Sequence, residues 1–322
     1  MIDDKKLSNG CAFYIIITVC ILFLVSISHG FHDRVGTNNS SYDPDALANR
    51  LEKEYDINIM WKGRGEYTRF NNSNVKATLT DKRMNSYLTL QKMEVILKRL
   101  PKGIFTEIKN NDSVKYYEGN RRKYSYIDIY FCNSIDVDGG YDIRGGYTAG
   151  LTGGYDDRSG LFIMLDISYP ANINNTFAHE LFHMFEWGIR DEYYNHRNGS
   201  SGVDFYKAWL DSNPAGYKYI SETMSGNFNI YDIDLSYGIE TEDKDHIFFV
   251  SKYAQASIQE DMAETFTHLL TDKGGNMMPK AYRSQHVQRK AKLLIDMLDR
   301  TYSTINKDAY WNRIYDELVE TY

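Results

Sequence analysis

The residues HELFH at positions 179–183 place two histidines four residues apart, with a glutamate directly after the first. If this segment is helical, His179 and His183 lie one turn apart on the same face, so both imidazoles can point at one metal ion. Glu180 then projects beside the ion without binding it, where it can take a proton from a metal-activated water. This spacing is typical of zinc metallopeptidases, whose catalytic zinc keeps one position for water.

An ordinary helix with two histidines on a polar face is the alternative interpretation. The far side of the helix expected over residues 174–188 is apolar, so the histidines are not expected to be free surface residues. Buried polar side chains need partners, and a shared metal ion supplies one. The apolar residues are Phe177, Leu181, Phe182, Phe185 and Trp187.

Two histidines do not complete a zinc site, and the third ligand has several candidates. Metzincins carry a glycine and a histidine where this chain has Glu186 and Ile189, so that arrangement is excluded. Asp191, eight residues after His183, could fold back toward the metal if Gly188 ends the helix. It could equally be a solvated residue in the charged run RDEYY.

A second helix, expected over residues 257–273, offers Glu260 and Glu264 one turn apart. One of them could bind the metal while the other accepts a hydrogen bond from the free ring nitrogen of a ligand histidine. Acidic residues are also favoured at a helix start by the helix dipole alone, so the spacing leaves both interpretations open.

The segment FFVSKYAQASIQEDMAETF (248–266), together with HELFH, resembles the lethal-factor-like zinc metallopeptidases, the gluzincin group that includes the Pro-Pro endopeptidases. That resemblance implies one Zn²⁺ ion held by His179, His183 and Glu260. It further implies that Glu180 is the general base and that Tyr253, seven residues before Glu260, donates a hydrogen bond to the oxyanion.

By the same resemblance, Glu264 supports a ligand histidine. Residues 97–108 and 208–219 also look like segments of related exported bacterial peptidases, whereas the long polar connection over 190–245 departs from the family.

The pattern of apolar residues predicts the elements that must position these side chains. Strands concentrated in the first half and helices in the second indicate an α+β domain. With the resemblance, we expect a zincin-like fold in which a small mixed sheet packs on the HExxH helix, followed by a helical C-terminal part. The expected strands cover 56–61, 123–132 and 160–168, and further helices cover 43–55, 84–100, 204–214, 286–302 and 308–322.

Two segments near the expected catalytic helix have more than one interpretation. The strand over 160–168 is either a core strand or a sheet edge that binds substrate as an added strand. The glycine-rich stretch over 138–157 matches no phosphate-binding loop, and we expect a mobile loop or hairpin, or else a lid over the cleft.

The N-terminus predicts export. Residues 1–30 combine Lys5 and Lys6 with an apolar run, which indicates a signal peptide or a membrane anchor. Residues 31–42 are expected to be a linker, and 43–322 a single metallopeptidase domain whose metal-site core covers about 158–273. Of three cysteines only Cys132 lies outside the export segment. The mature chain therefore forms no internal disulfide, which favours a bacterial exported protein, secreted or anchored at the cell surface.

A net charge of −7 argues against a nucleic-acid partner. We therefore expect an exported zinc endopeptidase that acts on protein or peptide substrates. The alternatives are a non-catalytic binding protein with a peptidase fold and a zinc hydrolase of a non-peptide amide. A protein of the first kind would be expected to lose Glu180 or Tyr253, and both are present.

Overall fold

The computed structural model describes most of the chain from residue 43 onward. The contacts divide the chain into two units, 1–43 and 44–322, and every described helix and strand belongs to the second. The predicted export segment (1–30) and linker (31–42) lie outside the described residues. The residues described are 43–65, 75–110, 126–137, 141–142, 146–151, 160–168, 170, 173–196, 205–223, 237–238, 241–271, 278–306 and 308–321.

A mixed sheet forms the first half of the domain. Its central order is β1-β3-β6-β5, in which β1, β3 and β6 run parallel and β5 runs antiparallel to β6. The short strands β2 and β4 pair antiparallel with the far part of β3. The strands are β1 (Asn58–Met60), β2 (Val75–Leu79), β3 (Tyr126–Val137), β4 (Tyr141–Asp142), β5 (Gly146–Leu151) and β6 (Gly160–Asp166).

The alternation of side chains along β3 and β6 gives the sheet two apolar faces. Successive residues of a strand point to opposite faces, so alternate residues belong to different clusters. The main core contains Ile127, Ile129 and Phe131 of β3, and the smaller cluster on the other face contains Tyr130 and Cys132. Cys132 is buried, as its place in the apolar alternation predicts.

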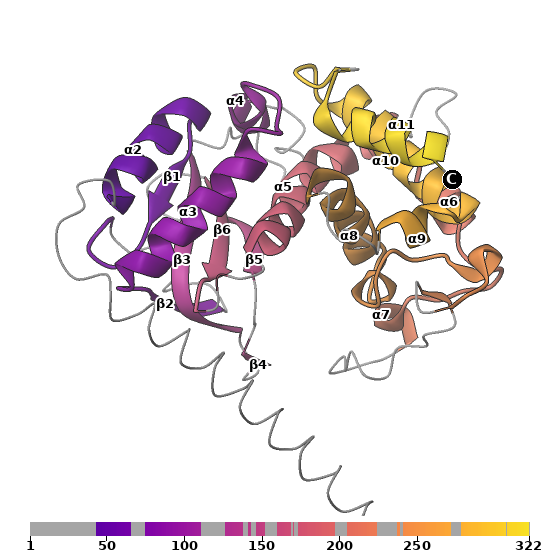
Figure 1. Ribbon diagram of the computed structural model, residues 1–322, viewed down its shortest axis with the longest axis horizontal. Helices are drawn as coiled ribbons and strands as arrows, with labels where there is room; N and C mark the ends of the chain where they lie inside the picture. The colour runs from indigo at the N-terminus through magenta and orange to yellow at the C-terminus, as the bar shows by residue number, and fades with distance from the viewer. Residues whose placement is uncertain are drawn as a thin grey trace, which may run out of the picture. The chain divides into compact units, whose positions relative to one another are not determined.

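Helices pack around the sheet and continue beyond it (Figure 1). Helix α5 contacts α3, β5 and β6 on one side and α8 on the other, so it joins the sheet to the C-terminal helices. Helix α10 in turn contacts α5, α6, α8 and α11. The helices are α2 (Pro44–Tyr55), α3 (Arg83–Leu97), α4 (Ile104–Asn110), α5 (Ile173–His196), α6 (Phe205–Leu210), α7 (Ile220–Thr223), α8 (Ile258–Thr271), α9 (Met278–Tyr282), α10 (Gln285–Thr301) and α11 (Tyr310–Thr321), with short 3₁₀ turns η6 (Lys244–His246) and η7 (Tyr253–Gln255).

Helix α5 is longer than the sequence suggested, because Gly188 does not end it. The helix continues through Gly188 to His196. A Cβ atom added at Gly188 would lie only 2.8 Å from Cζ of Tyr302 and closer still to its hydroxyl, which itself donates a 2.8 Å hydrogen bond to the carbonyl of Phe185. Glycine is needed here for the close approach of Tyr302, and the interpretation of Gly188 as a helix terminator was wrong.

The strand predicted over 160–168 is an inner strand and not an edge. β6 lies between β3 and β5, so the core-strand interpretation is correct. Among the described strands, the edge strand beside α5 is β5, which comes from the glycine-rich stretch and pairs with β6 in antiparallel register. The stretch over 138–157 therefore supplies two strands of the sheet, β4 and β5, while residues 138–140, 143–145 and 152–157 lie outside the described residues.

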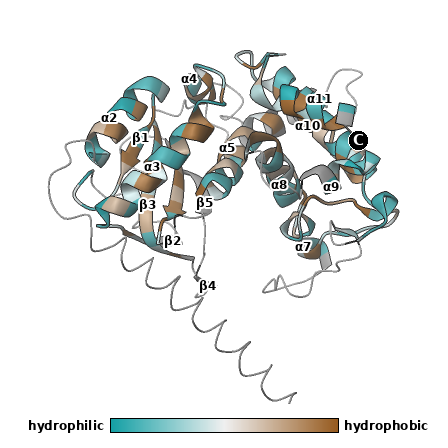
Figure 2. Ribbon diagram, in the orientation of Figure 1, coloured by the Kyte–Doolittle hydropathy of each residue, from teal (hydrophilic) through white to brown (hydrophobic). Residues whose placement is uncertain are grey.

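The predicted α+β class is confirmed, with a small mixed sheet packed on the helix that carries HELFH and a helical C-terminal part. In Figure 2 part of β1 and β3 carries the brown of apolar residues, and α2 alternates between brown and teal.

Across the described ranges, no helix combines the length and the apolar character that a bilayer crossing requires.

Candidate metal centre

Helix α5 presents both histidines of HELFH toward α8. Its apolar residues Phe177, Leu181 and Phe182 are fully buried, and they fix the rotation of the helix against the core. The rings of His179 and His183 lie on the remaining face, with centroids 4.9 Å apart. The i,i+4 spacing therefore brings the two imidazoles together as the sequence predicted.

Helix α8 supplies Glu260 from its first turn. The hydroxyl of Ser257 accepts a hydrogen bond from the backbone N–H of Glu260 at 3.2 Å, which caps the helix. In the usual capping box, a glutamate at this position would turn back toward the cap residue. Here its carboxylate instead lies against the two histidines of α5.

Three potential ligand atoms converge in this space. Nε2 of His179 lies 3.2 Å from Nε2 of His183 and 2.9 Å from Oε2 of Glu260, and Nε2 of His183 lies 3.6 Å from the same oxygen. Tetrahedral zinc with bonds of about 2.0–2.1 Å holds its ligand atoms about 3.3 Å apart. The three separations thus have the size that one zinc ion requires, and among the described residues this is the only group of three such side chains that could hold a metal.

Two more glutamates orient the imidazoles. Oε1 of Glu264 lies 2.9 Å from Nδ1 of His179, and Oε2 of Glu186 lies 3.5 Å from Nδ1 of His183. A carboxylate only accepts hydrogen bonds, so each Nδ1 carries a proton, and in the neutral imidazole each Nε2 turns its lone pair inward. The carboxylate–histidine arrangement is the one that usually supports metal-binding histidines.

The inward-facing atoms need a cation between them. Oε2 of Glu260 is buried and, within the part of the chain that the structure describes, has no hydrogen-bond partner of acceptable geometry. Two imidazole lone pairs and one carboxylate oxygen repel one another unless a proton or a metal ion lies among them. The donor set therefore fits a divalent metal such as zinc, which binds nitrogen and oxygen ligands together.

In the metal-free protein, protons can occupy the space among the three potential ligand atoms. Burial alone would lower the pKa of His179, but Glu260 and Glu264 outweigh it and raise the pKa to about 9. For His183, burial is likewise outweighed by Glu186 and Glu260, which raise the pKa to about 10. Burial would raise the pKa of Glu260, but the two histidines lower it to about 2, so its carboxylate stays ionised.

Glu180 and Tyr253 lie beside the three ligand atoms. Glu180 is buried, and its charge contributes to the raised pKa values of both histidines. The ring of Tyr253 in η7 lies 5.7 Å from the ring of His179 and is partly exposed. Burial of the phenol, together with the charges of Glu260 and Glu180, raises the pKa of Tyr253 well above its usual value. Its hydroxyl therefore stays protonated and able to donate a hydrogen bond.

The structure separates the candidates for the third ligand. Because α5 continues beyond Gly188, the backbone of Asp191 lies about 12 Å along the helix axis from that of His183. The helix therefore carries the backbone of Asp191 away from the histidines, and the fold-back that this alternative requires does not occur. Glu260 lies with the histidines instead, and Glu264 stands behind His179.

Glu186 is the residue that the sequence reasoning missed. In the sequence, Glu186 was noted only as the residue that stands where metzincins carry glycine. Its i,i+3 spacing from His183 was the available signal, because residues three apart on a helix are neighbours. Its side chain is almost fully buried against that histidine.

Comparisons with known proteins add one weak likeness. No protein-family model matches the sequence, and no curated protein is significantly similar to it. The fold is similar to the solved structure of a "putative zinc-binding metallo-peptidase" from Bacteroides caccae, with 15% sequence identity and a TM-score of 0.41 over 88% of this chain and 95% of the other. A likeness this low does not assign a function to the chain.

Proposed function

We propose that the chain is a zinc-dependent endopeptidase with His179, His183 and Glu260 as the metal ligands. The convergence of two imidazole nitrogens and one carboxylate oxygen, each at a spacing suited to one ion, is the observation that carries this proposal. When bound, zinc would polarise a carbonyl group and lower the pKa of a water molecule.

The chain's own groups would then complete the reaction. The buried carboxylate of Glu180, next to His179, takes the proton of the attacking water and passes it to the leaving amine. The protonated hydroxyl of Tyr253 donates a hydrogen bond to the carbonyl oxygen as it gains negative charge. No covalent enzyme intermediate is needed.

A peptide substrate would bind along β5. Among the described strands, β5 pairs only with β6, and it also contacts the catalytic helix α5. An extended peptide that pairs with the open side of β5 would lie beside the histidines as an added strand, held by main-chain hydrogen bonds. The sequence had suggested the segment over 160–168 for this role, and β5 takes its place because β6 is internal.

We also propose that the protein is exported and acts on extracellular protein or peptide substrates. The motifs of residues 1–30, which favour a signal peptide or an anchor, support this. The similarity of the segment 248–266 to lethal-factor-like and Pro-Pro endopeptidase-like enzymes supports the subfamily assignment, with Glu264 behind the ligand histidine.

The test is incubation of the purified protein with a mixed peptide library, with product masses compared before and after chelation and after zinc is added back. Cleavage that chelation abolishes and zinc restores supports the proposal. If the zinc-loaded protein leaves every peptide intact, a binding protein or a hydrolase of non-peptide amides is favoured instead.

A further inference from the structure

A buried ion pair lies directly behind the proposed ligand Glu260. Nζ of Lys290, on α10, is 2.6 Å from Oδ2 of Asp261, on α8, and their side chains are 1% and 0% exposed. A buried ion pair often adds no net stability over an apolar pair of the same volume. The pair can instead serve to fix the elements that it joins.

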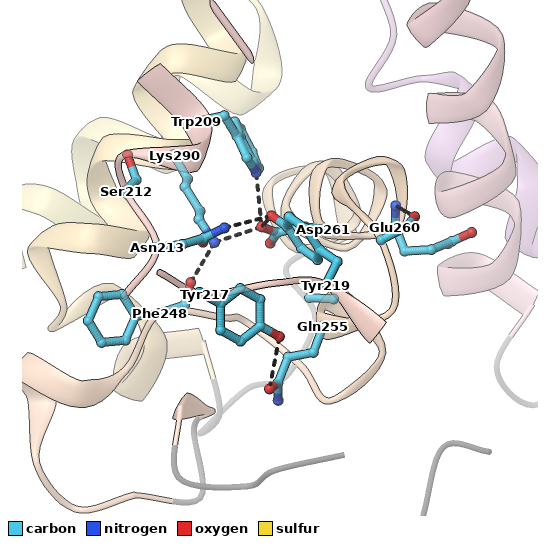
Figure 3. Close-up of polar contacts among 12 residues, drawn as sticks. Trp209, Ser212, Asn213, Tyr217, Tyr219, Phe248, Gln255, Glu260, Asp261 and Lys290 are labelled. Atoms are coloured by element: carbon cyan, nitrogen blue, oxygen red, sulfur yellow. Dashed lines mark hydrogen bonds and ion pairs between the residues drawn. The ribbon is translucent and has the colours of Figure 1, made fainter. Parts of the chain in front are cut away.

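The carboxylate of Asp261 restrains the first turn of α8. Besides Lys290, Oδ2 accepts hydrogen bonds from Nε1 of Trp209 at 2.9 Å and from the hydroxyl of Tyr219 at 2.7 Å. Figure 3 shows these donors on one side of α8, while Glu260 points away from the opposite side. Asp261 directly follows Glu260 in the helix. The three buried hydrogen bonds to Asp261 therefore limit any rotation of this turn that would displace Glu260.

The same ammonium group also holds the segment that leads to Tyr253. Nζ of Lys290 donates a 2.8 Å hydrogen bond to the carbonyl of Phe248, five residues before Tyr253. It also lies 4.0 Å from the ring centroid of Phe249, a cation–π contact. The neighbouring carbonyl of Ile247 accepts a hydrogen bond from Ser284, at the cap of α10.

We propose that Lys290 is a positioning residue that keeps Glu260 and Tyr253 in register. It does so by binding Asp261 on α8 and the carbonyl of Phe248 at the same time. The inference rests on the proposed function, because it takes Glu260 as a metal ligand and Tyr253 as an oxyanion donor. A misplacement of about 1 Å at such groups costs up to about 100-fold in rate.

The experiment uses the double variant Asp261→Leu/Lys290→Met in the full chain. Both charges are replaced by apolar side chains of similar size, so no uncompensated charge is buried and the fold is expected to survive. Zinc affinity is measured by competition with a chelator, the ligand geometry by the visible spectrum of the Co²⁺-substituted protein, and kcat and KM on a cleaved peptide. Lys292→Met is the matched control, because Lys292 lies on the same helix in an exposed pair with Asp296.

The positioning role predicts that the double variant, with wild-type secondary structure, loses about tenfold or more in both zinc affinity and kcat, with an altered Co²⁺ spectrum and little change in KM. The Lys292→Met control keeps wild-type values. A folded double variant with wild-type zinc affinity, spectrum and kcat overturns the inference.

Tyr219→Phe covers the case in which the double variant fails to fold. It removes one hydrogen bond to Asp261, together with the bond that the hydroxyl accepts from Asn213, and adds no buried charge. A several-fold loss of zinc affinity and a shifted Co²⁺ spectrum support the restraint on α8, and wild-type values overturn it. If the wild type binds Co²⁺ but cleaves no peptide, the proposed function fails, and the spectra of the variants still decide the positioning role.

Discussion

Oε1 of Glu264 lies 2.9 Å from Nδ1 of His179, one helical turn beyond Glu260 on the same helix. Helix α8 thus supplies both the third potential ligand and the group that orients the first. Removing the charge of Glu264 should therefore weaken metal binding without removing a ligand.

We expect Glu264→Gln to weaken zinc affinity about 10- to 100-fold, the usual effect of losing a carboxylate that supports a ligand histidine. The measurement is a competition titration against a chromophoric chelator. Glu186→Gln is the matched variant at His183, and its effect should be smaller because its contact is longer, at 3.5 Å. Unchanged affinity in Glu264→Gln would contradict this role.

Glu180→Ala should leave zinc bound and abolish cleavage. The carboxylate is adjacent to the ligands without being one of them, so the metal content measured by atomic spectroscopy stays at the wild-type value. The loss of a positioned general base lowers kcat by about 100- to 10,000-fold. A variant that binds zinc and cleaves peptides as fast as the wild type would rule out the mechanism.

Tyr253→Phe tests the oxyanion donor. The ring of Tyr253 keeps its place beside His179, while the hydroxyl is lost. Removal of one such donor lowers kcat by about 100- to 1,000-fold. KM and zinc affinity should change little, so steady-state kinetics combined with a metal titration separates this effect from a damaged site. If zinc affinity falls as much as kcat, Tyr253 helps to hold the metal site and does not act only on the oxyanion.

Zinc binding should release protons. The pKa values of about 9 for His179 and about 10 for His183 lead us to expect protonated imidazole at pH 7 in the metal-free protein. Zinc needs both imidazoles neutral, so protons leave as it binds, and zinc affinity rises as the pH increases toward 10. Calorimetry in buffers of different ionisation enthalpy counts these protons, and a release of none at pH 7 would contradict the raised pKa values.

The same shifts determine how the stability of the metal-free protein depends on pH. Both histidines have a higher pKa in the folded state than the usual value near 6.5. Their contribution to the free energy of unfolding is therefore fully present below about pH 6.5 and is lost as the pH rises through about 9 to 10. Urea titrations of the chelated protein at pH 6 and pH 10 measure this, and greater stability at pH 10 would contradict it.

Gly188→Ala should destabilise the protein even though alanine favours helices. The added methyl group collides with Tyr302, whose hydroxyl binds the carbonyl of Phe185. Overpacking costs about 1–3 kcal/mol, against a gain of about 1 kcal/mol in helix propensity. Pairing it with Tyr302→Phe, which removes the clashing oxygen, should recover part of the loss in a denaturant titration. A single variant more stable than the wild type would show that glycine is not needed there.

The sequence predicted much of the fold because local patterns carry it. The alternation over 123–132 and the apolar stripe over 84–100 correspond to β3 and α3, since a side chain's face depends only on its spacing along a strand or helix. The short strand β2 and the helices α4, α7 and α9 were missed, because none of them repeats a pattern long enough to be recognised.

The sequence by itself determined that His179 and His183 share one helix face, because their spacing matches the helical repeat, and that Glu180 projects beside them. Only the tertiary structure decided which acidic residue joins them. Glu260 reaches the histidines because α8 packs across α5, while Asp191 is carried away by the continuing helix. The edge position of β5, the support from Glu186 and the link from Lys290 to Asp261 likewise depend on packing. Contacts between residues distant along the chain leave no periodic signal in the sequence, so they become visible only once the core has brought the helices together.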